Sequence, residues 1–343
     1  MSGAMDEHSA ALPMAALHGR AQQALRHWGL TDQTPELLKF RENAVFRIRL
    51  ADGAPAALRL HRPGYHDDRA LASELQWMAA LKAGGLHVPA PVPTLDGRNL
   101  VTLPATSAFA SQHADVVSWM HGEELGRSGE PLRHPPELLA AIFGQLGEAM
   151  AELHNISDRW TPPASFTRPA WDLDGLLGES PFWGRFWDCP GLTPDAARQL
   201  AALRPLLAER LRAADRSGFD YGLIHADLVR ENVLFGDDHV ELIDFDDAGY
   251  GWRMFDIATT LLRNRREPHF DLIQASLIAG YRRRRPLPEA ALETLPLFLL
   301  IRSLTYVGWI GARPGTSDAQ ERLARYVGEA LELAEPFLQE RRG

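Results

Sequence analysis

Four polar residues in one short stretch of the chain have the types and the spacing that phosphoryl transfer requires. His225, Asp227 and Asn232 form an H-x-D-x-x-x-x-N pattern, and Asp244 follows among apolar residues. A carboxylate can orient and deprotonate an attacking hydroxyl, while an amide oxygen and a second carboxylate hold the magnesium ions that neutralise phosphate charge. The pattern therefore predicts Asp227 as the catalytic base, with Asn232 and Asp244 as ligands of Mg²⁺.

The elements around these residues are predicted to bring them together. Residues 233–235 and 240–243 are apolar runs on either side of a turn signal at 236–238. A hairpin at this point would place Asn232, at the start of one strand, beside Asp244, at the end of the other. Because Mg²⁺ takes only one or two protein carboxylates besides phosphate and water, two protein ligands are sufficient.

This block resembles the catalytic core of the aminoglycoside phosphotransferase and choline kinase superfamily. Members carry H-G-D-x-x-x-x-N followed by I-D-[FW]-[DE], and Asp227, Asn232 and Asp244 fall on those positions. Ala226 stands where the family usually has Gly; since Ala tolerates most backbone conformations except a positive φ, we expect little effect. The resemblance implies an α+β, two-lobed protein-kinase-like fold, with ATP and Mg²⁺ bound between a small sheet-containing lobe and a larger helical lobe.

The same resemblance extends upstream to a basic residue and its partner. Residues 57–60 are predicted to form a strand, and Arg59 falls where kinase-like folds place a cation, usually Lys, on the ATP phosphates. Glu74 opens a predicted helical stretch and is similar to the helix glutamate that holds that cation. An exposed strand Arg and a solvated helix Glu are the structural alternative.

Two further segments are assigned to nucleotide binding by resemblance. Residues 43–48 resemble the family's first strand pair, and without a Gly-rich loop the backbone around Asn43 would cover the phosphates. Residues 115–119 are predicted to form a strand that enters a hinge, where the backbone of Ser118 and Met120 would hydrogen-bond adenine. A buried edge strand without a ligand explains the same residues equally well.

Organisation along the chain agrees with two lobes. Residues 1–119 are predicted to form the nucleotide-binding lobe, with residues 1–30 as a helical extension whose helix ends at Gly29, and residues 120–343 the catalytic and substrate lobe. The segment 160–192 is rich in Pro, Gly and Trp, and is predicted to form loops near the acceptor. Its acidic residues either bind an amine of the acceptor or cap helices; they include Asp172, Asp174 and Glu179.

Composition narrows the class of partner and the compartment. The chain has 343 residues, of which 45% are hydrophobic, and a formal net charge of −9, which argues against nucleic acid as a partner. The lone Cys189 excludes a disulfide framework and favours the cytoplasm, as does an N-terminus without a signal-like pattern. The apolar stretch 295–311 is interrupted by Arg302 and is expected to be a core helix rather than a membrane span. The sequence indicates no oligomeric state.

Three functions from different classes remain open from the sequence. The first is an ATP-dependent kinase for a small hydroxyl-bearing metabolite, such as an amino alcohol, homoserine or an aminoglycoside. The second is a protein Ser/Thr kinase of the bacterial stress-response type, and the third is a nucleotide-binding pseudokinase. Only eleven residues separate Asp244 from Asp256, which by resemblance ties the following helix to the catalytic loop. A long activation segment does not fit there, and this favours a small acceptor.

Overall fold

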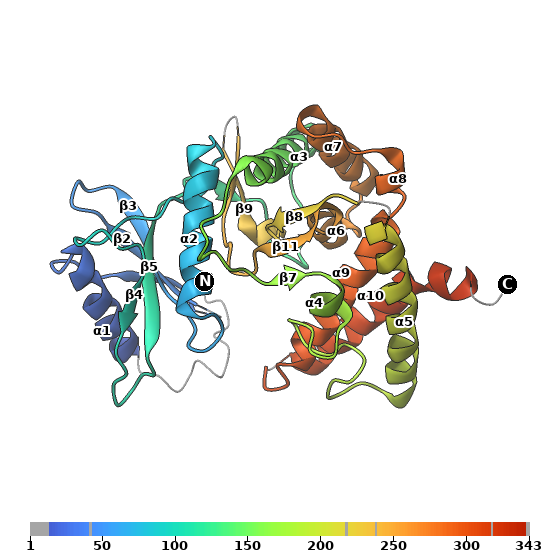
Figure 1. Cartoon of the computed structure of the whole chain (residues 1–343), viewed down its shortest axis with the longest axis horizontal. Coiled ribbons are helices and arrows are strands. Elements are labelled where there is room, and N and C mark those ends of the chain that lie inside the picture. The colour runs from blue at the N-terminus through green and yellow to red at the C-terminus, as the bar shows by residue number, and fades with distance from the viewer. Residues whose placement is uncertain (1–13, 41–42, 217–218, 237–238, 317, 341–343) are drawn as a thin grey trace. The chain divides into compact units, whose positions relative to one another are not determined.

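The chain forms two compact units in the computed structural model, which describes residues 14–40, 43–216, 219–236, 239–316 and 318–340 (Figure 1). Unit 1 runs to His121 and also includes Trp160–Arg168, whereas unit 2 comprises Gly122–Arg159 and Pro169–Gly343. The sequence placed the boundary between residues 119 and 120, and assigned all of segment 160–192 to the larger lobe. The structure divides that segment between the two units.

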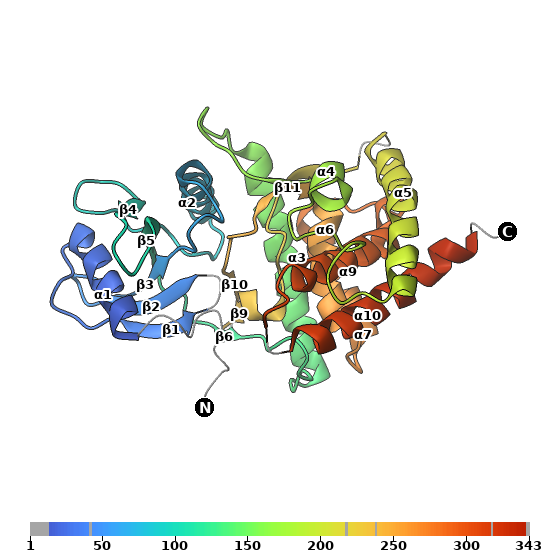
Figure 2. The same cartoon turned by 90° about the horizontal axis from the view of Figure 1, so that it is seen from below.

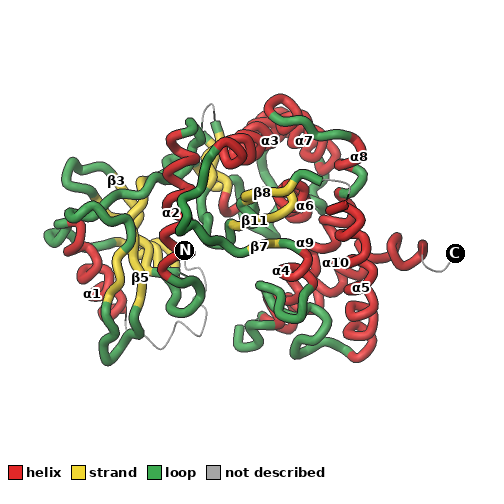
Figure 3. Tube along the Cα trace, viewed as in Figure 1, coloured by secondary structure: helices red, strands yellow, loops and turns green. Residues whose placement is uncertain are grey.

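Unit 1 is an antiparallel sheet with helices on its faces, and Figure 3 shows the sheet in yellow with α1 and α2 in red. The strand order is β1-β2-β3-β5-β4. Its elements are α1 (Met14–Leu25), a short 3₁₀ helix (Arg26–Trp28), β1 (Glu36–Phe40), β2 (Ala44–Arg49), β3 (Pro55–Leu60), α2 (Asp68–Ala83), β4 (Val101–Leu103) and β5 (Gln112–Ser118).

Alternation along β3 decides what each face of this sheet contacts. Leu58 and Leu60 are fully buried in one cluster with Leu17 and Leu25 of α1. Arg59 points to the opposite face, because successive side chains of a strand alternate. There it meets Glu74 of α2, so the apolar face is covered by α1 and the charged face by α2.

The boundaries in unit 1 correct two sequence predictions. Strand β1 was not predicted, since its sequence shows no clean alternation, and all five of its residues are exposed or half-buried in the structure. Helix α2 begins at Asp68, after Asp67 accepts a hydrogen bond from the Ala70 N–H, so Glu74 lies inside the helix rather than opening it. Gly29 does end the N-terminal helical segment, with φ 70°, although the first residues predicted for that segment lie outside the described part.

Unit 2 is mainly helical, with two small sheets ordered β10-β9-β6 and β7-β11-β8 (Figures 2 and 3). Its elements are β6 (Glu123–Glu124), α3 (Pro136–Arg159), β7 (Ala170–Trp171), α4 (Leu173–Leu177), α5 (Pro194–Arg216), β8 (Tyr221–Ile224), a 3₁₀ turn (Arg230–Asn232), β9 (Val233–Phe235), β10 (Val240–Leu242), β11 (Gly249–Trp252), α6 (Arg253–Asn264), α7 (Phe270–Arg284), α8 (Glu289–Leu292), α9 (Leu295–Gly311) and α10 (Ala319–Glu340).

Three helix pairs hold unit 2 together: α3 with α7, and α9 with both α6 and α10. Helices α3 and α7 cross with their backbones in contact, because a Cβ on Gly147 would lie 2.1 Å from the Leu277 carbonyl oxygen. Helix α9 packs against α6 and α10, and all but two of its residues are buried. By length and composition alone, the stretch Glu289–Gly311 is long and apolar enough to cross a membrane. However, 67% of its most apolar 18-residue segment is buried inside the protein, as in a core helix.

Candidate active site

A helix carboxylate fixes the backbone of the loop that carries the candidate base. Strand β8 ends at Ile224, and the next two amides donate to Asp256 of α6, from His225 at 3.0 Å and from Ala226 at 2.7 Å. Asp256 also contacts His154 Nε2 at 3.1 Å. The His225 ring is buried and its Nε2 lies 3.0 Å from the Ile243 carbonyl oxygen. The backbone of the loop is therefore held by Asp256 and the His225 ring by the Ile243 carbonyl, which is the supporting position proposed for these two residues.

Ala226 corrects one sequence expectation. Its φ is 65°, in the left-handed region where a Cβ is disfavoured. This is the conformation that a Gly at the same position adopts freely, so the departure from the family pattern carries strain of about 1 kcal/mol. The hydrogen bond from its N–H to Asp256 helps to hold the residue in this conformation.

Both oxygens of Asp227 have partners. Oδ2 accepts from Asn232 Nδ2 at 3.1 Å, and Oδ1 accepts from Nη2 of Arg302 at 2.6 Å. The Asp227 side chain is 23% exposed, whereas that of Arg302 is fully buried. Burial raises the pKa of Asp227 above its ordinary value; the positive charge of Arg302 opposes this rise and the negative charge of Asp244 adds to it.

Arg302 was missed as a site residue, since the sequence showed it only as an interruption of an apolar helix. Its guanidinium carbon lies 4.4 Å from the ring centroid of Trp183, 4.5 Å from that of Tyr306 and 5.4 Å from that of Phe255. Nη2 also donates to the Tyr306 hydroxyl at 2.8 Å. A buried charge is costly without an opposite charge, so a lone Arg in an apolar helix was itself a signal that a carboxylate lies nearby.

The predicted hairpin forms and brings the candidate metal ligands together. Strands β9 and β10 pair with Leu242 opposite Val233, and the Ile243 N–H donates to the Asn232 carbonyl oxygen at 3.0 Å. Asp244, the next residue, also has a positive φ of 66°. Part of the predicted turn, residues 237–238, lies outside the described residues.

The donor set at this point fits a hard cation. Asn232 Nδ2 donates to Asp227, so its Oδ1 is the atom left to act as a ligand. Together with the Asp244 carboxylate, it offers the amide and carboxylate oxygens that Mg²⁺ prefers. Over the described ranges there is no group of three or more His, Cys, Asp or Glu residues that could hold a metal, so phosphate and water oxygens would complete the coordination.

In unit 1, the predicted pair of Arg59 and Glu74 is present, with Nη1 2.8 Å from Oε1. A second carboxylate was not predicted: Asp115 of β5 accepts from Arg59 Nε at 2.8 Å and from Nη2 at 2.9 Å. Arg59, Glu74 and Asp115 are all buried. The sequence treated Asp115 only as the start of a strand, and no local pattern marks it as the partner of a residue 56 positions away.

The other three nucleotide-binding candidates of unit 1 are Asn43, Ser118 and Met120. Asn43 Oδ1 accepts from the Arg62 N–H at 2.9 Å. The N–H of Ser118 donates to the Ala90 carbonyl oxygen at 2.8 Å, so Ser118 could offer adenine at most its own carbonyl. Met120 is half-buried, beyond the end of β5.

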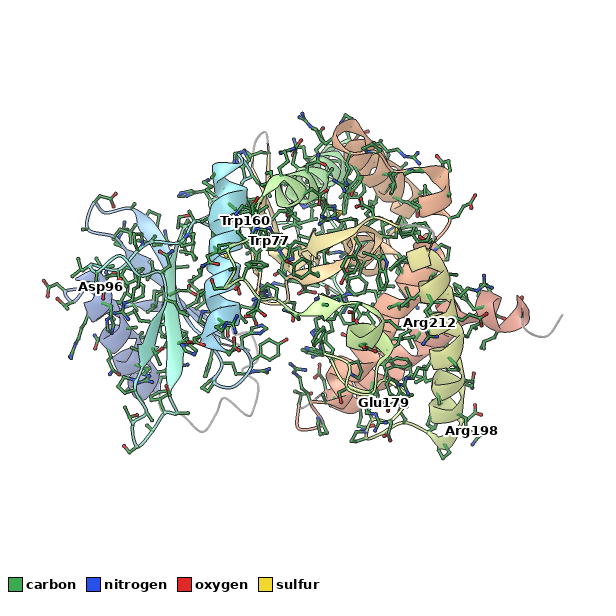
Figure 4. All side chains as sticks on the ribbon, in the orientation of Figure 1. Trp77, Asp96, Trp160, Glu179, Arg198 and Arg212 are labelled. Atoms are coloured by element: carbon green, nitrogen blue, oxygen red, sulfur yellow. The ribbon has the colours of Figure 1, made fainter. Side chains whose placement is uncertain are left out.

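Two of the three acidic residues considered for the acceptor, Asp172 and Glu179, have structural partners, and the third, Asp174, is an exposed residue in the first turn of α4. Asp172 caps α4 by accepting hydrogen bonds from the N–H groups of Asp174 and Gly175, which is the helix-capping alternative given by the sequence. Glu179, labelled in Figure 4, forms an ion pair with Arg204 at 2.7 Å, and its side chain is 75% exposed. The capping contacts of Asp172 and the ion pair of Glu179 account for both residues by a structural role.

The chain is similar to known proteins over most of its length. A model of the phosphotransferase enzyme family matches residues 36–290, which include the hairpin, the catalytic loop and the Arg59–Glu74 pair. The chain belongs to this family. Homoserine kinase of Pseudomonas aeruginosa is 30% identical to this family member over 275 residues, which cover 77% of the chain and 76% of that protein.

Solved structures of kinases also match this chain over most of its length. A microcompartment-associated aminopropanol kinase matches with a TM-score of 0.79 and 33% identity, over 94% of this chain and 98% of that one. An amicoumacin kinase solved with AMP-PNP and Ca²⁺ matches with a TM-score of 0.72 over 95% and 96% of the two chains; at 19% identity it shows a shared fold. This member of the phosphotransferase enzyme family therefore has the predicted kinase-like α+β fold, and is a kinase that phosphorylates a hydroxyl group of a small molecule.

Proposed function

We propose that the protein uses ATP and Mg²⁺ to phosphorylate a small metabolite that carries a hydroxyl group, of the amino alcohol, homoserine-like or aminoglycoside-like kind. The observation that carries the proposal is the position of Asp227. Its carboxylate is held by Asn232 and Arg302 on a fixed loop, yet remains 23% exposed. A carboxylate that is both held and accessible suits a general base for an incoming hydroxyl.

In the proposed reaction, the acceptor hydroxyl oxygen attacks the γ-phosphorus of ATP as the bond from that phosphorus to the β–γ bridging oxygen breaks. Asp227 accepts the hydroxyl proton, and ADP leaves. Asn232 and Asp244 would hold Mg²⁺, which neutralises phosphate charge when bound. Arg59, held by Glu74, would contact the ATP phosphates, and the backbone of Asn43, Ser118 and Met120 would lie against the nucleotide.

Small acceptors are favoured by the connection after Asp244. The residues that follow form β11 and lead directly into α6, where Asp256 lies. A classical activation segment, on which a protein substrate docks, does not fit there. The homoserine and aminopropanol kinases among the relatives support the same choice. The protein is proposed to act in the cytoplasm, in agreement with the single thiol, Cys189, whose pKa is raised to about 11 by burial.

The test is ADP release from Mg·ATP with a panel of hydroxyl-bearing amines, amino acids, sugars and aminoglycosides, run beside a general protein substrate. Saturable ADP release with one small acceptor, and a phosphorylated product of matching mass, is the expected result. Transfer to protein Ser or Thr with no active small acceptor would replace the proposal by a protein kinase. Tight ATP binding without transfer to any acceptor would indicate a pseudokinase.

A further inference from the structure

A buried cluster of charged side chains lies on the α2 face of the sheet in unit 1. Arg59 bonds both Asp115 and Glu74, as described above. On the far side of Asp115, His61 Nε2 lies 2.6 Å from Oδ2, and on the far side of Glu74, Arg168 Nη1 lies 3.6 Å from Oε2. All five side chains are at most 10% exposed. Each carboxylate is thus shared between two basic side chains.

Strand register explains why Asp115 reaches Arg59. In the antiparallel pair of β3 and β5, Arg59 stands directly opposite Asp115. Directly opposed residues project their side chains to the same face, close enough to interact. Nε and Nη2 of Arg59 can therefore bind the two Asp115 oxygens in parallel, a geometry that a guanidinium allows and an ammonium does not.

The donor count separates Arg from Lys at this position. An Arg side chain carries five N–H donors and a Lys ammonium three. Asp115 takes the Nε donor and one on Nη2, and Glu74 takes one on Nη1. One N–H on each Nη remains, and the side chain keeps 10% exposure. A Lys that satisfied both carboxylates to the same extent would have no N–H left for a phosphate.

We infer that Asp115 is a positioning residue that makes the phosphate-binding cation of this protein an obligatory arginine. The inference rests on the proposed function, in which Arg59 contacts the ATP phosphates. Asp115 fixes the guanidinium plane, and Glu74 fixes its rotation about the end of the side chain. Two N–H groups are then presented together to the nucleotide. His61 holds Asp115 in turn: an ionised carboxylate can only accept a hydrogen bond, so His61 donates to Asp115 through Nε2.

Electrostatics agree with an ionised Asp115. Burial by itself would raise the pKa of this carboxyl, but its interactions with Arg59 and His61 lower it to about 2. Asp115 therefore keeps its negative charge at neutral pH, and replacing Arg59 by a side chain that cannot reach it would leave a buried charge without its main partner. Breaking a buried pair from one side is strongly destabilising.

The test is a double-mutant cycle on the full chain, with Mg·AMP-PNP affinity measured by calorimetry and melting temperature as a second readout. Arg59→Lys should weaken binding by roughly 10–100-fold, the value of one or two charge-assisted hydrogen bonds. Asp115→Asn, which keeps the size and an acceptor for His61, should weaken it about tenfold because Arg59 loses its fixed plane. The double variant should return to within about fivefold of the wild type, since Lys then has to satisfy only Glu74.

A matched control comes from an exposed pair in the same unit. Arg98 Nη2 lies 2.7 Å from Asp96 Oδ2, with both side chains more than half exposed, and Figure 4 shows Asp96 at the edge of the unit, apart from α2. Arg98→Lys makes the same chemical change without touching the cluster. It should alter neither nucleotide affinity nor melting temperature, since exposed pairs contribute little.

Four outcomes would contradict the inference. Arg59→Lys binding within about threefold of the wild type would show that arginine is not required. A double variant no tighter than Arg59→Lys would show that Asp115 is not the reason. If Arg59→Lys does not fold, the double variant decides: it should fold and bind, and its failure to do so counts against the pair. Coupling in melting temperature alone, without coupling in nucleotide affinity, would show that the pair is purely structural. Absence of Mg·AMP-PNP binding in the wild type would instead contradict the proposed function.

Discussion

Arg302 Nη2 lies 2.6 Å from Asp227 Oδ1, across 75 residues of sequence, and makes a buried cation the direct partner of the candidate base. The pair joins α9 to the catalytic loop inside unit 2. Because Asn232 holds the other oxygen of Asp227, the carboxylate is fixed at both ends. The orientation of the proposed base therefore depends on a helix that the sequence identified only as part of the core.

Replacing Arg302 tests this dependence. Arg302→Met keeps the length and apolar contacts of the side chain but removes the charge, so Asp227 loses one of its two anchors. We expect kcat to fall roughly 10–100-fold while Mg·AMP-PNP affinity stays within about twofold, because the lost contact acts on the reacting oxygen rather than on the nucleotide. Arg302→Lys should recover part of the activity.

Arg313→Met is the control, since Arg313 also stacks on an aromatic ring, 4.4 Å from that of Trp309, but has no contact with Asp227 among the interactions described. It should leave kcat unchanged. Equal losses in nucleotide affinity and kcat for Arg302→Met, together with a lower melting temperature, would indicate general misfolding and contradict a positioning role.

Asp227→Asn tests the base itself. The amide keeps the size and one oxygen but cannot accept the hydroxyl proton, so turnover should fall by about 10²–10⁴-fold with nucleotide affinity retained. Asp271→Asn, which changes an exposed acid at the start of α7, should have no effect. Near-normal turnover by Asp227→Asn on the true acceptor would remove Asp227 from the proposed role.

Asp244 should contribute more to metal binding than Asn232. Asp244→Ala should abolish the Mg²⁺ dependence of AMP-PNP binding, because a carboxylate contributes charge that a methyl group cannot replace. Asn232→Ala should be milder for metal, although it also frees Asp227 Oδ2 and should lower kcat. Magnesium titrations of nucleotide binding measure both effects, and unchanged titration curves for Asp244→Ala would show that another residue holds the metal.

Ala226→Gly should stabilise the loop. The residue has a φ of 65°, and a Gly adopts this conformation without the steric cost of a Cβ. We expect a gain of about 0.5–1 kcal/mol in the free energy of unfolding, seen as a higher melting temperature with activity retained. The control is Ala248→Gly, at a buried position whose φ is not positive, which should destabilise instead. A lower melting temperature for Ala226→Gly would mean that the buried methyl group outweighs the strain.

Stability should decrease with acid because of His154. Its imidazole is fully buried, and burial lowers its pKa well below the ordinary value, with the charges of Arg253 and Arg285 adding to this effect. The unfolded chain takes up a proton at this side chain as pH falls through about 6.5, whereas the folded protein does not, so protonation favours unfolding. Melting temperatures from pH 7.5 to 5 should fall less steeply for His154→Gln than for the wild type. The exposed His269→Gln serves as control, and an unchanged slope in His154→Gln would contradict the assignment.

The sequence by itself determined how the candidate residues Asp227, Asn232 and Asp244 come together, because the contacts that bring them together are local. A short hairpin brings Asn232 next to the residue that precedes Asp244, and only the loop 228–231 separates Asn232 from Asp227. Apolar runs and turn residues encode such a hairpin directly, so residue types and spacing were enough. The Arg59–Glu74 pair was likewise predicted, in this case from the family pattern, and the structure contains it.

Only the tertiary structure decided which charges fix these groups. Arg302 and Asp115 reach their partners across 75 and 56 residues, through the packing of α9 in unit 2 and the register of β3 with β5 in unit 1. No periodicity specifies a pairing at such separations. The positive φ of Ala226 is also a tertiary result, because Asp256 of α6 binds the amides of the turn and holds it in a conformation that Ala alone disfavours. Local sequence selects the chemical groups, and long-range packing selects their orientation.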